Sequence, residues 1–253
     1  MQEKAIAQPV PSGEWEYHQS RFAQLPKIPF RILVSGKSQS GKGVLTVNAV
    51  TDFWKDCFQS VYVFASTVHV DTTWQTIAHY AHRNLQQGRK EQFLFNDFDE
   101  TALGEIMERQ KLAISKQKKD PDIKKLKGIL IIIDDLSHHS GLHRQSTGIL
   151  SKLMTLGRHY GISLWCNVHS INSLGSLARR QASAVIVFSI ANSREYDSIR
   201  EQYGKLVGLP EFDRMYDIAI REAPPFSFLT IHASSNDPRR TFMIRFEAWL
   251  EPE

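Results

Sequence analysis

Short apolar runs rich in β-branched residues recur along the chain and constrain its fold more than any other feature. They are near-continuous rather than alternating, which is typical of parallel strands covered on both faces. The runs span 30–35, 60–66, 92–96, 128–135, 161–168, 184–190 and 226–233. Segments with helical spacing lie at 42–56, 98–118, 144–157, 193–204 and 210–216. This alternation predicts an α/β fold with a mostly parallel central sheet flanked by helices.

The remaining segments set the limits of that fold. Residues 1–27 contain three prolines and one glycine without a clear apolar period, so we expect a flexible or partner-bound N-terminal arm. Residues 28–253 then form a single domain. Within it, 239–250 is expected to add a last strand or a hairpin, as a C-terminal β extension.

Composition excludes several classes of protein. A surplus of 31 Lys+Arg over 27 Asp+Glu permits a polyanionic partner without requiring one. Cys57 and Cys166 are the two cysteines, so no disulfide framework is indicated and a reducing compartment is expected. No apolar run approaches the about 18 residues that a membrane helix needs, and the N-terminus lacks the apolar core of a signal peptide. We therefore expect a soluble intracellular protein with no membrane span.

The stretch 35-SGKSQSGKG-43 follows the first apolar run and nearly matches a phosphate-binding loop. The template is Gly-x4-Gly-Lys-[Ser/Thr], and Gly36, Gly41 and Lys42 fit it. A strand, a glycine-rich turn and a helix direct backbone N–H groups at an anion, and Lys42 would reach the β- and γ-phosphates. The sequence predicts that ATP is bound by Gly36, Lys37, Ser38, Gln39, Ser40, Gly41, Lys42, Gly43 and Val44.

Gly43 departs from this template, because the usual Ser or Thr hydroxyl ligates Mg²⁺ directly. Ser38, Ser40, Thr46 or a water could take its place, and the sequence does not choose among them. A purely structural turn is the alternative for the whole loop. If the loop does bind ATP, we expect a lower Mg²⁺ affinity than at a site with that hydroxyl.

A second motif, 129-ILIIIDDLS-137, is an isoleucine-rich strand that ends in two carboxylates. At such a strand end Asp134 can hold Mg²⁺, and Asp135 can orient or deprotonate an attacking water. The alternative is that paired acids only end the strand and cap the next turn. Because this pair follows a loop that lacks a metal ligand of its own, the two motifs together predict ATP hydrolysis.

The order of motifs resembles the FtsK/HerA superfamily of DNA-pumping ATPases, and most closely the viral packaging ATPases of the poxvirus, giant-virus, virophage and Polinton type. Over about residues 30 to 205 the chain presents a Walker A loop, a Walker B strand, an Arg-His pair and a further arginine pair. These are 36-GKSQSGK-42, 130-LIIIDDL-136, 158-RHYGIS-163 and 179-RR-180. The resemblance implies a P-loop NTPase of the RecA-like type.

The resemblance also implies a function and partners. The function is an ATP-driven motor, with Mg²⁺ as cofactor, that translocates double-stranded DNA into a viral capsid. Such a motor acts as a homo-oligomeric ring, expected to be a hexamer, and contacts viral capsid proteins. It would act in the host cytoplasm, in a viral factory or on the virion.

Two sites depart from, or extend, the family pattern. His169 follows Val168 where the family has a Thr-Gln sensor, and it can still donate a hydrogen bond toward the γ-phosphate or the water. Asn167 is a second candidate for that role, and a packed or capping histidine is the alternative. For an arginine finger acting on the neighbouring subunit, Arg180 is the first choice by motif position. The other candidates are Arg158 and Arg179.

Other features admit more than one interpretation. The segment 111-KLAISKQKKDPDIKKLK-127 holds seven lysines against two aspartates, and is either a solvated helix end and loop or a DNA-phosphate contact. His138, His139 and His143 could ligate a metal, although a loop facing solvent or DNA fits them better. Two rival functions stay open: a P-loop kinase acting on a small acceptor, and a degenerate P-loop scaffold that binds DNA or capsid protein.

Overall fold

A computed structural model describes residues 15–85, 87, 91–136, 139 and 148–253 of the chain. The strands are β1 (Arg31–Ser35), β2 (Phe58–Ala65), β3 (Leu94–Phe95), β4 (Gly128–Asp134), β5 (Ile162–Val168), β6 (Ala184–Val187), β7 (Leu229–Ile231), β8 (Phe242–Ile244) and β9 (Ala248–Leu250). The helices are α1 (Lys42–Asn48), α2 (Thr72–Asn84), α3 (Glu100–Gln117), α5 (Ile149–Leu156), α6 (Ser176–Gln181), α7 (Ser193–Tyr203) and α8 (Leu209–Tyr216).

Within these residues one sheet of nine strands forms, in the order β3-β2-β4-β5-β1-β6-β7-β8-β9. From β3 to β6 all neighbouring strands are parallel, whereas β7, β8 and β9 extend the sheet antiparallel from β6. The prediction of an α/β fold with a mostly parallel sheet is confirmed. The segment 239–250, for which a last strand or hairpin partner was expected, contains two strands, β8 and β9, that pair antiparallel.

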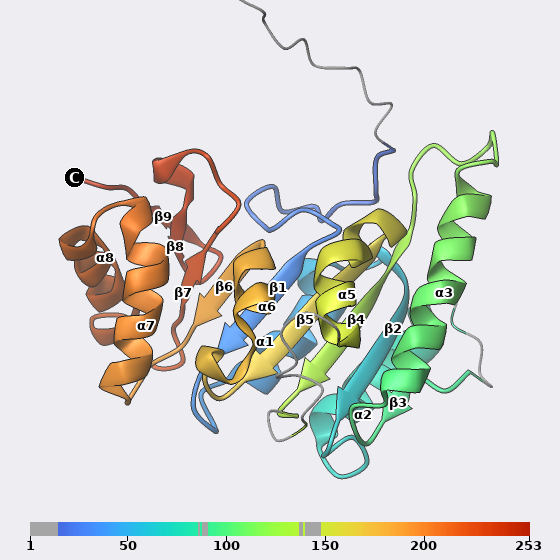
Figure 1. The fold of residues 1–253 in the computed structure, drawn as a ribbon, viewed down its shortest axis with the longest axis horizontal. Helices are drawn as coiled ribbons and strands as arrows, with labels where there is room; N and C mark the ends of the chain where they lie inside the picture. The colour runs from blue at the N-terminus through green and yellow to red at the C-terminus, as the bar shows by residue number, and fades with distance from the viewer. Residues whose placement is uncertain (1–14, 86, 88–90, 137–138, 140–147) are drawn as a thin grey trace, which may run out of the picture.

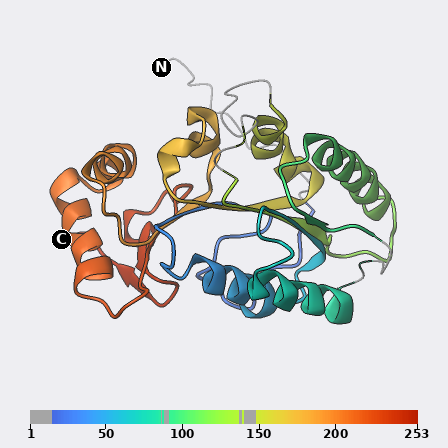
Figure 2. The ribbon, with the colours of Figure 1, turned by 90° about the horizontal axis from the view of Figure 1, so that it is seen from below.

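Helices cover both faces of the sheet (Figure 2), with α1 and α2 on one face and α3, α5 and α6 on the other. Side chains of β4 alternate between these two layers. Ile131 and Ile133 pack in the core cluster that includes α3 and α5, whereas Leu130 and Ile132 pack in the cluster that includes α1 and α2. Burial on both faces is the reason that this strand is apolar at every position before its carboxylates.

Two helices, α2 and α6, were not predicted, and one predicted helix needs correction. Helix α2 buries Trp74, Ile77 and Ala81, whose spacing is typical of a helix, so this element could have been predicted. The predicted helix 42–56 ends as α1 and continues as a π-helical turn over 49–53. The lysine-rich segment begins in α3, which ends at Gln117, in agreement with the helix expected over 98–118.

Residues 15–27 of the predicted arm pack against the domain. The backbone N–H of His18 donates to the carbonyl of Leu126 at 3.0 Å, and that of Leu126 donates to the carbonyl of Glu16 at 2.8 Å. Farther along, the indole of Trp54 donates to the carbonyl of Pro26 at 3.3 Å, and Leu25 is buried. The earlier part of the predicted arm lies outside the described residues.

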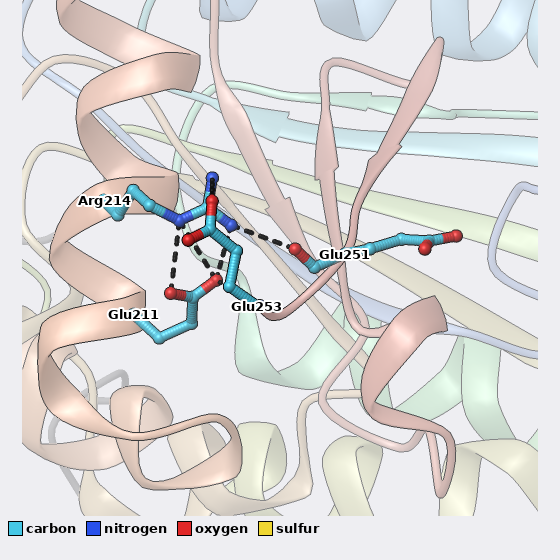
Figure 3. A network of polar contacts seen from close by, with 4 residues as sticks. All are labelled: Glu211, Arg214, Glu251 and Glu253. Atoms are coloured by element: carbon cyan, nitrogen blue, oxygen red, sulfur yellow. Dashed lines mark hydrogen bonds and ion pairs between the residues drawn. The ribbon is translucent and has the colours of Figure 1, made fainter.

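The C-terminal residues are attached to α8 by a polar network (Figure 3). Arg214 forms a double hydrogen bond with the carboxylate of Glu211 and donates to the carbonyl of Glu251 at 3.0 Å. The carboxylate of Glu253 lies 3.5 Å from the same guanidinium. These contacts hold the end of the chain beside α8. In the part of the chain that the structure describes, no helix is long and apolar enough to cross a membrane.

Candidate functional site

The phosphate-binding loop lies between β1 and α1, at the edge of the sheet where β1, β5 and β4 end side by side (Figure 1). A Cβ atom on Gly36 would come within 2.7 Å of Ser40 Oγ and 2.8 Å of Phe188 Cβ, so no larger residue fits there. Gly41 has a φ of 101°, which favours glycine. Packing against Ser40 and Phe188 therefore requires a glycine at position 36, and the backbone conformation favours one at position 41.

Lys42 begins α1 and folds back over this loop. Its Nζ donates to the carbonyls of Gly36 and, at 2.9 Å, Lys37. Burial lowers the pKa of Lys42, and the negative charges of Asp134, Asp135 and Glu195 oppose that shift. Each of these hydrogen bonds is to a neutral carbonyl, so an anion in the loop could replace them at little cost.

Asp134 is the last residue of β4 and lies beside the loop. The amide of Asn167 donates to its Oδ1 at 2.7 Å. Burial raises the pKa of Asp134 most, and the charges of Asp135 and Asp71 raise it further, while the Asn167 hydrogen bond and Lys42 act in the opposite direction. Burial therefore disfavours the charged form of Asp134 more than Asn167 and Lys42 stabilise it. A cation bound beside this carboxylate would be favourable.

Asp135 and His169 meet in front of this carboxylate. His169 Nε2 lies 2.8 Å from Asp135 Oδ1, and both side chains are partly exposed. Asp135 has a φ of 49°, in the left-handed region that few non-glycine residues adopt, and its N–H donates to the carbonyl of Asn167 at 3.3 Å. The two residues were predicted to act separately on the water and the γ-phosphate, and the structure places them in direct contact.

Asn167, the second candidate sensor, is buried beneath the site. Its amide donates to Thr46 Oγ1 at 3.0 Å as well as to Asp134, and its Oδ1 accepts from the indole of Trp165 at 2.8 Å. The Thr46 hydroxyl also donates to the carbonyl of Lys42 at 2.8 Å. Because these groups are used in a buried network, Asn167 positions Asp134, and Thr46 does not stand in for the hydroxyl missing at Gly43.

Lys42, Asp134, Asp135 and His169 line a cavity of about 1070 Å³. Of the predicted ATP-binding residues, Ser38 to Val44 line it, whereas Gly36 and Lys37 do not. Its polar end also contains Asp134, Asp135, His169, Asp71, Thr67 and Thr73. Six phenylalanines also line the cavity: Phe22, Phe53, Phe188, Phe226, Phe228 and Phe246. Among these, Phe226 is exposed and has a φ of 63°, and its side chain lies next to Gly41.

The candidate arginines lie elsewhere. Arg180 is exposed in the last turn of α6, shortly before Ser183, whose N–H donates to the carbonyl of Arg31 at 2.8 Å. Arg31 begins β1, so Arg180 lies toward the edge of the sheet opposite the loop. Burial, and after it the charge of Arg158, lower the pKa of Arg31, so Arg158 is near that edge too. Arg179 donates to Asn172 at 2.7 Å. None of the three candidates lines the cavity of its own chain.

Several site residues were missed by sequence reasoning. Asp71, Thr67 and Thr73 surround the start of α2, where the Asp71 side chain caps the helix by accepting from the N–H of Thr73 at 2.8 Å. An Asp before two threonines is an N-cap pattern, so this helix start could have been recognised. Glu195 accepts from Ser35 Oγ at 2.7 Å and comes from the first turn of α7, with no sequence pattern that connects it to the loop.

The carboxylates fit Mg²⁺, which is commonly bound by one or two carboxylates together with substrate phosphates. Asp134 and Asp71 supply such oxygens at the polar end of the cavity. Within the described residues no group of three or more His, Cys, Asp or Glu could hold a metal alone, so phosphate oxygens would have to complete the site. Of the histidines considered for a separate metal, His138 and His143 lie outside the described residues, and the His139 ring packs against Phe98.

Comparisons with known proteins identify the family. The family model described as Poxvirus A32 protein matches residues 17–203. No curated protein matches the chain. Among solved structures, the genome-packaging NTPase B204 of Sulfolobus turreted icosahedral virus 2, in complex with AMP, is similar with a TM-score of 0.59 and 16% identity over 86% of this chain and 96% of that one.

Two further solved structures have similar folds. The pCW3 conjugation coupling protein TcpA has a TM-score of 0.55 and 15% identity, over 87% of this chain and 61% of that one. The Type VII secretion ATPase EccC of Thermomonospora curvata has a TM-score of 0.55 and 14% identity, over 86% of this chain and 25% of that one. These likenesses confirm the predicted α/β fold with a mostly parallel sheet flanked by helices. Because the family model spans most of the sequence, the chain belongs to the Poxvirus A32 protein family, as its resemblance to viral packaging ATPases predicted.

Proposed function

We propose that this chain hydrolyses ATP to translocate double-stranded DNA into a viral capsid. The observation that carries the proposal is the convergence of the phosphate-binding loop, Asp134, Asp135 and His169 on one cavity in a member of the A32 family. A genome-packaging NTPase with the same fold, B204, has been solved with ATPγS, which supports ATP as the ligand of this cavity.

The loop and Lys42 would bind the phosphates. Ser40 Oγ is buried without a hydrogen-bond partner among the described residues, and it lies in the turn that the phosphates would occupy. Lys42 Nζ would exchange its two carbonyl partners for phosphate oxygens, which are stronger acceptors. The exposed ring of Phe226, which lines the cavity, is suited to stacking on the base.

The acidic pair would divide metal binding and water activation. Asp134 and Asp71 would hold Mg²⁺, which when bound would neutralise charge on the β- and γ-phosphates. The contact with His169 occupies one oxygen of Asp135 and leaves the other to orient the attacking water and accept its proton. His169 would thereby position Asp135, and because it lines the same cavity we expect it to respond to the γ-phosphate as well.

Assembly of several copies of the chain would supply the remaining catalytic group, an arginine. Arg180 is exposed on α6 and outside the cavity of its own chain, so any catalytic contact that it makes would be with the nucleotide of a neighbouring subunit. A ring, which we expect to be a hexamer, would then hydrolyse ATP only when assembled. Contacts with DNA would be to phosphates and independent of sequence, and capsid proteins would be further partners.

The experiment is steady-state ATP hydrolysis with Mg²⁺, with and without double-stranded DNA, over a range of protein concentrations. Wild type is expected to hydrolyse ATP faster with DNA and at higher protein concentration. Lys42→Ala and Asp135→Asn should each lower the rate by about 100-fold or more. Lys205→Ala, which removes an exposed lysine far from the loop in sequence, is the matched control and should match wild type.

Other outcomes would contradict the proposal in distinguishable ways. Hydrolysis that depends on a small acceptor and ignores DNA would indicate a kinase. Absence of ATP binding by wild type would indicate a scaffold that has lost nucleotide chemistry. Equal rates in wild type and Lys42→Ala would show that any hydrolysis comes from another site or a contaminant.

A further inference from the structure

The position of Gly43 is adjoined by a hydroxyl from another helix. A Cβ atom on Gly43 would lie 3.2 Å from Thr73 Oγ1 and 3.7 Å from Thr73 Cγ2, and among the described residues no other atom from outside α1 comes within 4 Å of it. In the usual motif a Ser or Thr hydroxyl would extend from that Cβ. The Thr73 hydroxyl therefore lies beside the space in which the missing hydroxyl would be found.

The start of α2 fixes Thr73 in this place. Asp71 caps the helix through the Thr73 N–H, at 2.8 Å. Trp74, the next residue, is buried, and its indole donates to Thr67 Oγ1 at 3.1 Å. Thr73 itself is half-buried and β-branched, so few side-chain rotamers are open to it. The contacts of Asp71 and Trp74 therefore hold the start of α2, and with it the Thr73 hydroxyl, in position.

The surroundings of Thr73 favour a cation. Thr73, Asp71 and Asp134 line the same polar end of the cavity as Lys42 and Gly43. Asp71 is near enough to Asp134 for its charge to act on that carboxylate. Carboxylates and hydroxyls are the hard oxygen donors that Mg²⁺ prefers, and the loop would direct phosphate oxygens to the same end.

Other hydroxyls fit the role less well. Thr46 Oγ1 is buried and bonded to Lys42, Asn167 and Trp165. Ser40 Oγ points to the opposite end of the loop, within 2.7 Å of the Cβ position of Gly36. No atom of Ser38 comes within 4 Å of the Cβ position of Gly43, so among these side chains only Thr73 has its hydroxyl beside Gly43.

We infer that Thr73 supplies from α2 the Mg²⁺-ligating hydroxyl that the loop lacks at Gly43. This inference rests on the proposed function, since it takes the Mg²⁺ complex of ATP as the ligand. It also explains why a glycine is suited to position 43: a side chain there would crowd Thr73, because 3.2 Å is a tight contact for a Cβ atom. The Mg²⁺-ligating hydroxyl can therefore stand at position 73 or at position 43. Side chains at both positions would require one of the two residues to move.

The test measures metal binding rather than hydrolysis. Mn²⁺, which accepts the same oxygen ligands, is titrated into the protein with ATPγS while free Mn²⁺ is followed by electron paramagnetic resonance. Thr73→Val removes the hydroxyl with little change of shape, and should weaken Mn²⁺ binding in the ternary complex by about tenfold or more. Binding of ATPγS in EDTA should be unchanged. Thr73→Ser keeps the hydroxyl and should bind Mn²⁺ within about threefold of wild type.

Two further variants make the result specific. Thr72→Val removes an exposed hydroxyl one residue away, outside the cavity, and should behave as wild type. The double variant Gly43→Ser, Thr73→Ala moves the hydroxyl to its usual position and should recover Mn²⁺ binding that Thr73→Ala alone loses. Unchanged Mn²⁺ binding in Thr73→Val, or an equal loss in Thr72→Val, would overturn this inference but not the proposed function. Failure of wild type to bind ATPγS would instead overturn the proposed function.

Discussion

At the scale of single residues, the charged carboxylate of Asp134 lowers the stability of the metal-free protein near neutral pH. Its pKa is raised mainly by burial, so the folded protein holds its proton more tightly than the unfolded chain does. A raised pKa stabilises the fold below the unfolded pKa, and this contribution is lost as pH rises through the folded pKa. Near neutral pH the metal-free protein therefore carries an unfavourable buried charge, which a bound cation would compensate.

The substitution Asp134→Asn should accordingly raise the stability of the metal-free protein near neutral pH, by on the order of 1 kcal/mol. The Asn167 amide can still donate to the remaining Oδ1. The gain should shrink as pH falls through the raised pKa, because wild type then becomes protonated. Thermal unfolding in EDTA at a series of pH values measures both effects. Asp197→Asn, at an exposed position on α7, should show neither, and a variant that melts below wild type at neutral pH would refute the argument.

At the scale of elements, side-chain hydrogen bonds join two strands and a helix beneath the site. Thr46 of α1 bonds both Asn167 and Trp165 of β5, and Asn167 in turn bonds Asp134 of β4. Since β1 leads directly into the loop and α1, the network fixes the Walker A and Walker B segments relative to each other. We expect this buried joint to contribute to stability as well as to geometry.

Thr46→Val should destabilise the protein by about 1–3 kcal/mol, because it removes three hydrogen bonds from a fully buried network. Thr51→Val is the matched control. Thr51 makes the same bond to the carbonyl four residues earlier, at 2.9 Å, but is only half-buried, so its loss should cost about 0.5 kcal/mol or less. Urea unfolding of both variants gives the comparison. Similar losses in the two variants would mean that the network adds nothing beyond a helical hydroxyl bond.

The same elements explain what could be predicted from sequence. The strand before Asp134 was recognisable because both of its faces are buried, and Gly36 and Gly41 were recognisable because the turn has no room for a side chain at the first and a positive φ at the second. Helix α2 was missed although its buried residues have helical spacing and Asp71 caps its start, and Thr73 was missed with it. The contact between Asp135 and His169 could not be predicted, since it depends on how two strand ends are aligned and not on either local pattern.

At the scale of the whole molecule, the sheet has a nucleotide edge and a basic edge. Strands β1, β4 and β5 end at the lower edge in Figure 1, where the phosphate-binding loop lies. The loop from 118 to 127 precedes β4 and so lies at the opposite edge. There a second hollow of about 760 Å³ is lined by Lys116, Lys124, Lys125 and Lys127, with His18 beside them. Burial and the charges of Lys127 and Lys125 lower the pKa of His18, which indicates a positive local potential.

This separation allows DNA binding to be tested apart from nucleotide binding. Lys124→Glu combined with Lys125→Glu should weaken binding of a labelled DNA duplex. The slope of log K against log salt should become shallower by about 1 for each DNA phosphate that the protein no longer neutralises. ATPγS binding without DNA should be unchanged, because the substitutions lie at the other edge of the sheet. Fluorescence anisotropy at several salt concentrations provides the measurement.

Lys152→Glu with Lys205→Glu changes the net charge equally at exposed positions on other elements, and should weaken duplex binding less. An equal loss in both double variants would indicate a response to net charge alone. Undiminished DNA binding with loss of self-association would mean that the lysine loop contacts a neighbouring subunit. Only a loss of DNA affinity that is specific to the loop, with nucleotide binding intact, fits a motor in which ATP acts at one edge of the sheet and DNA is held at the other.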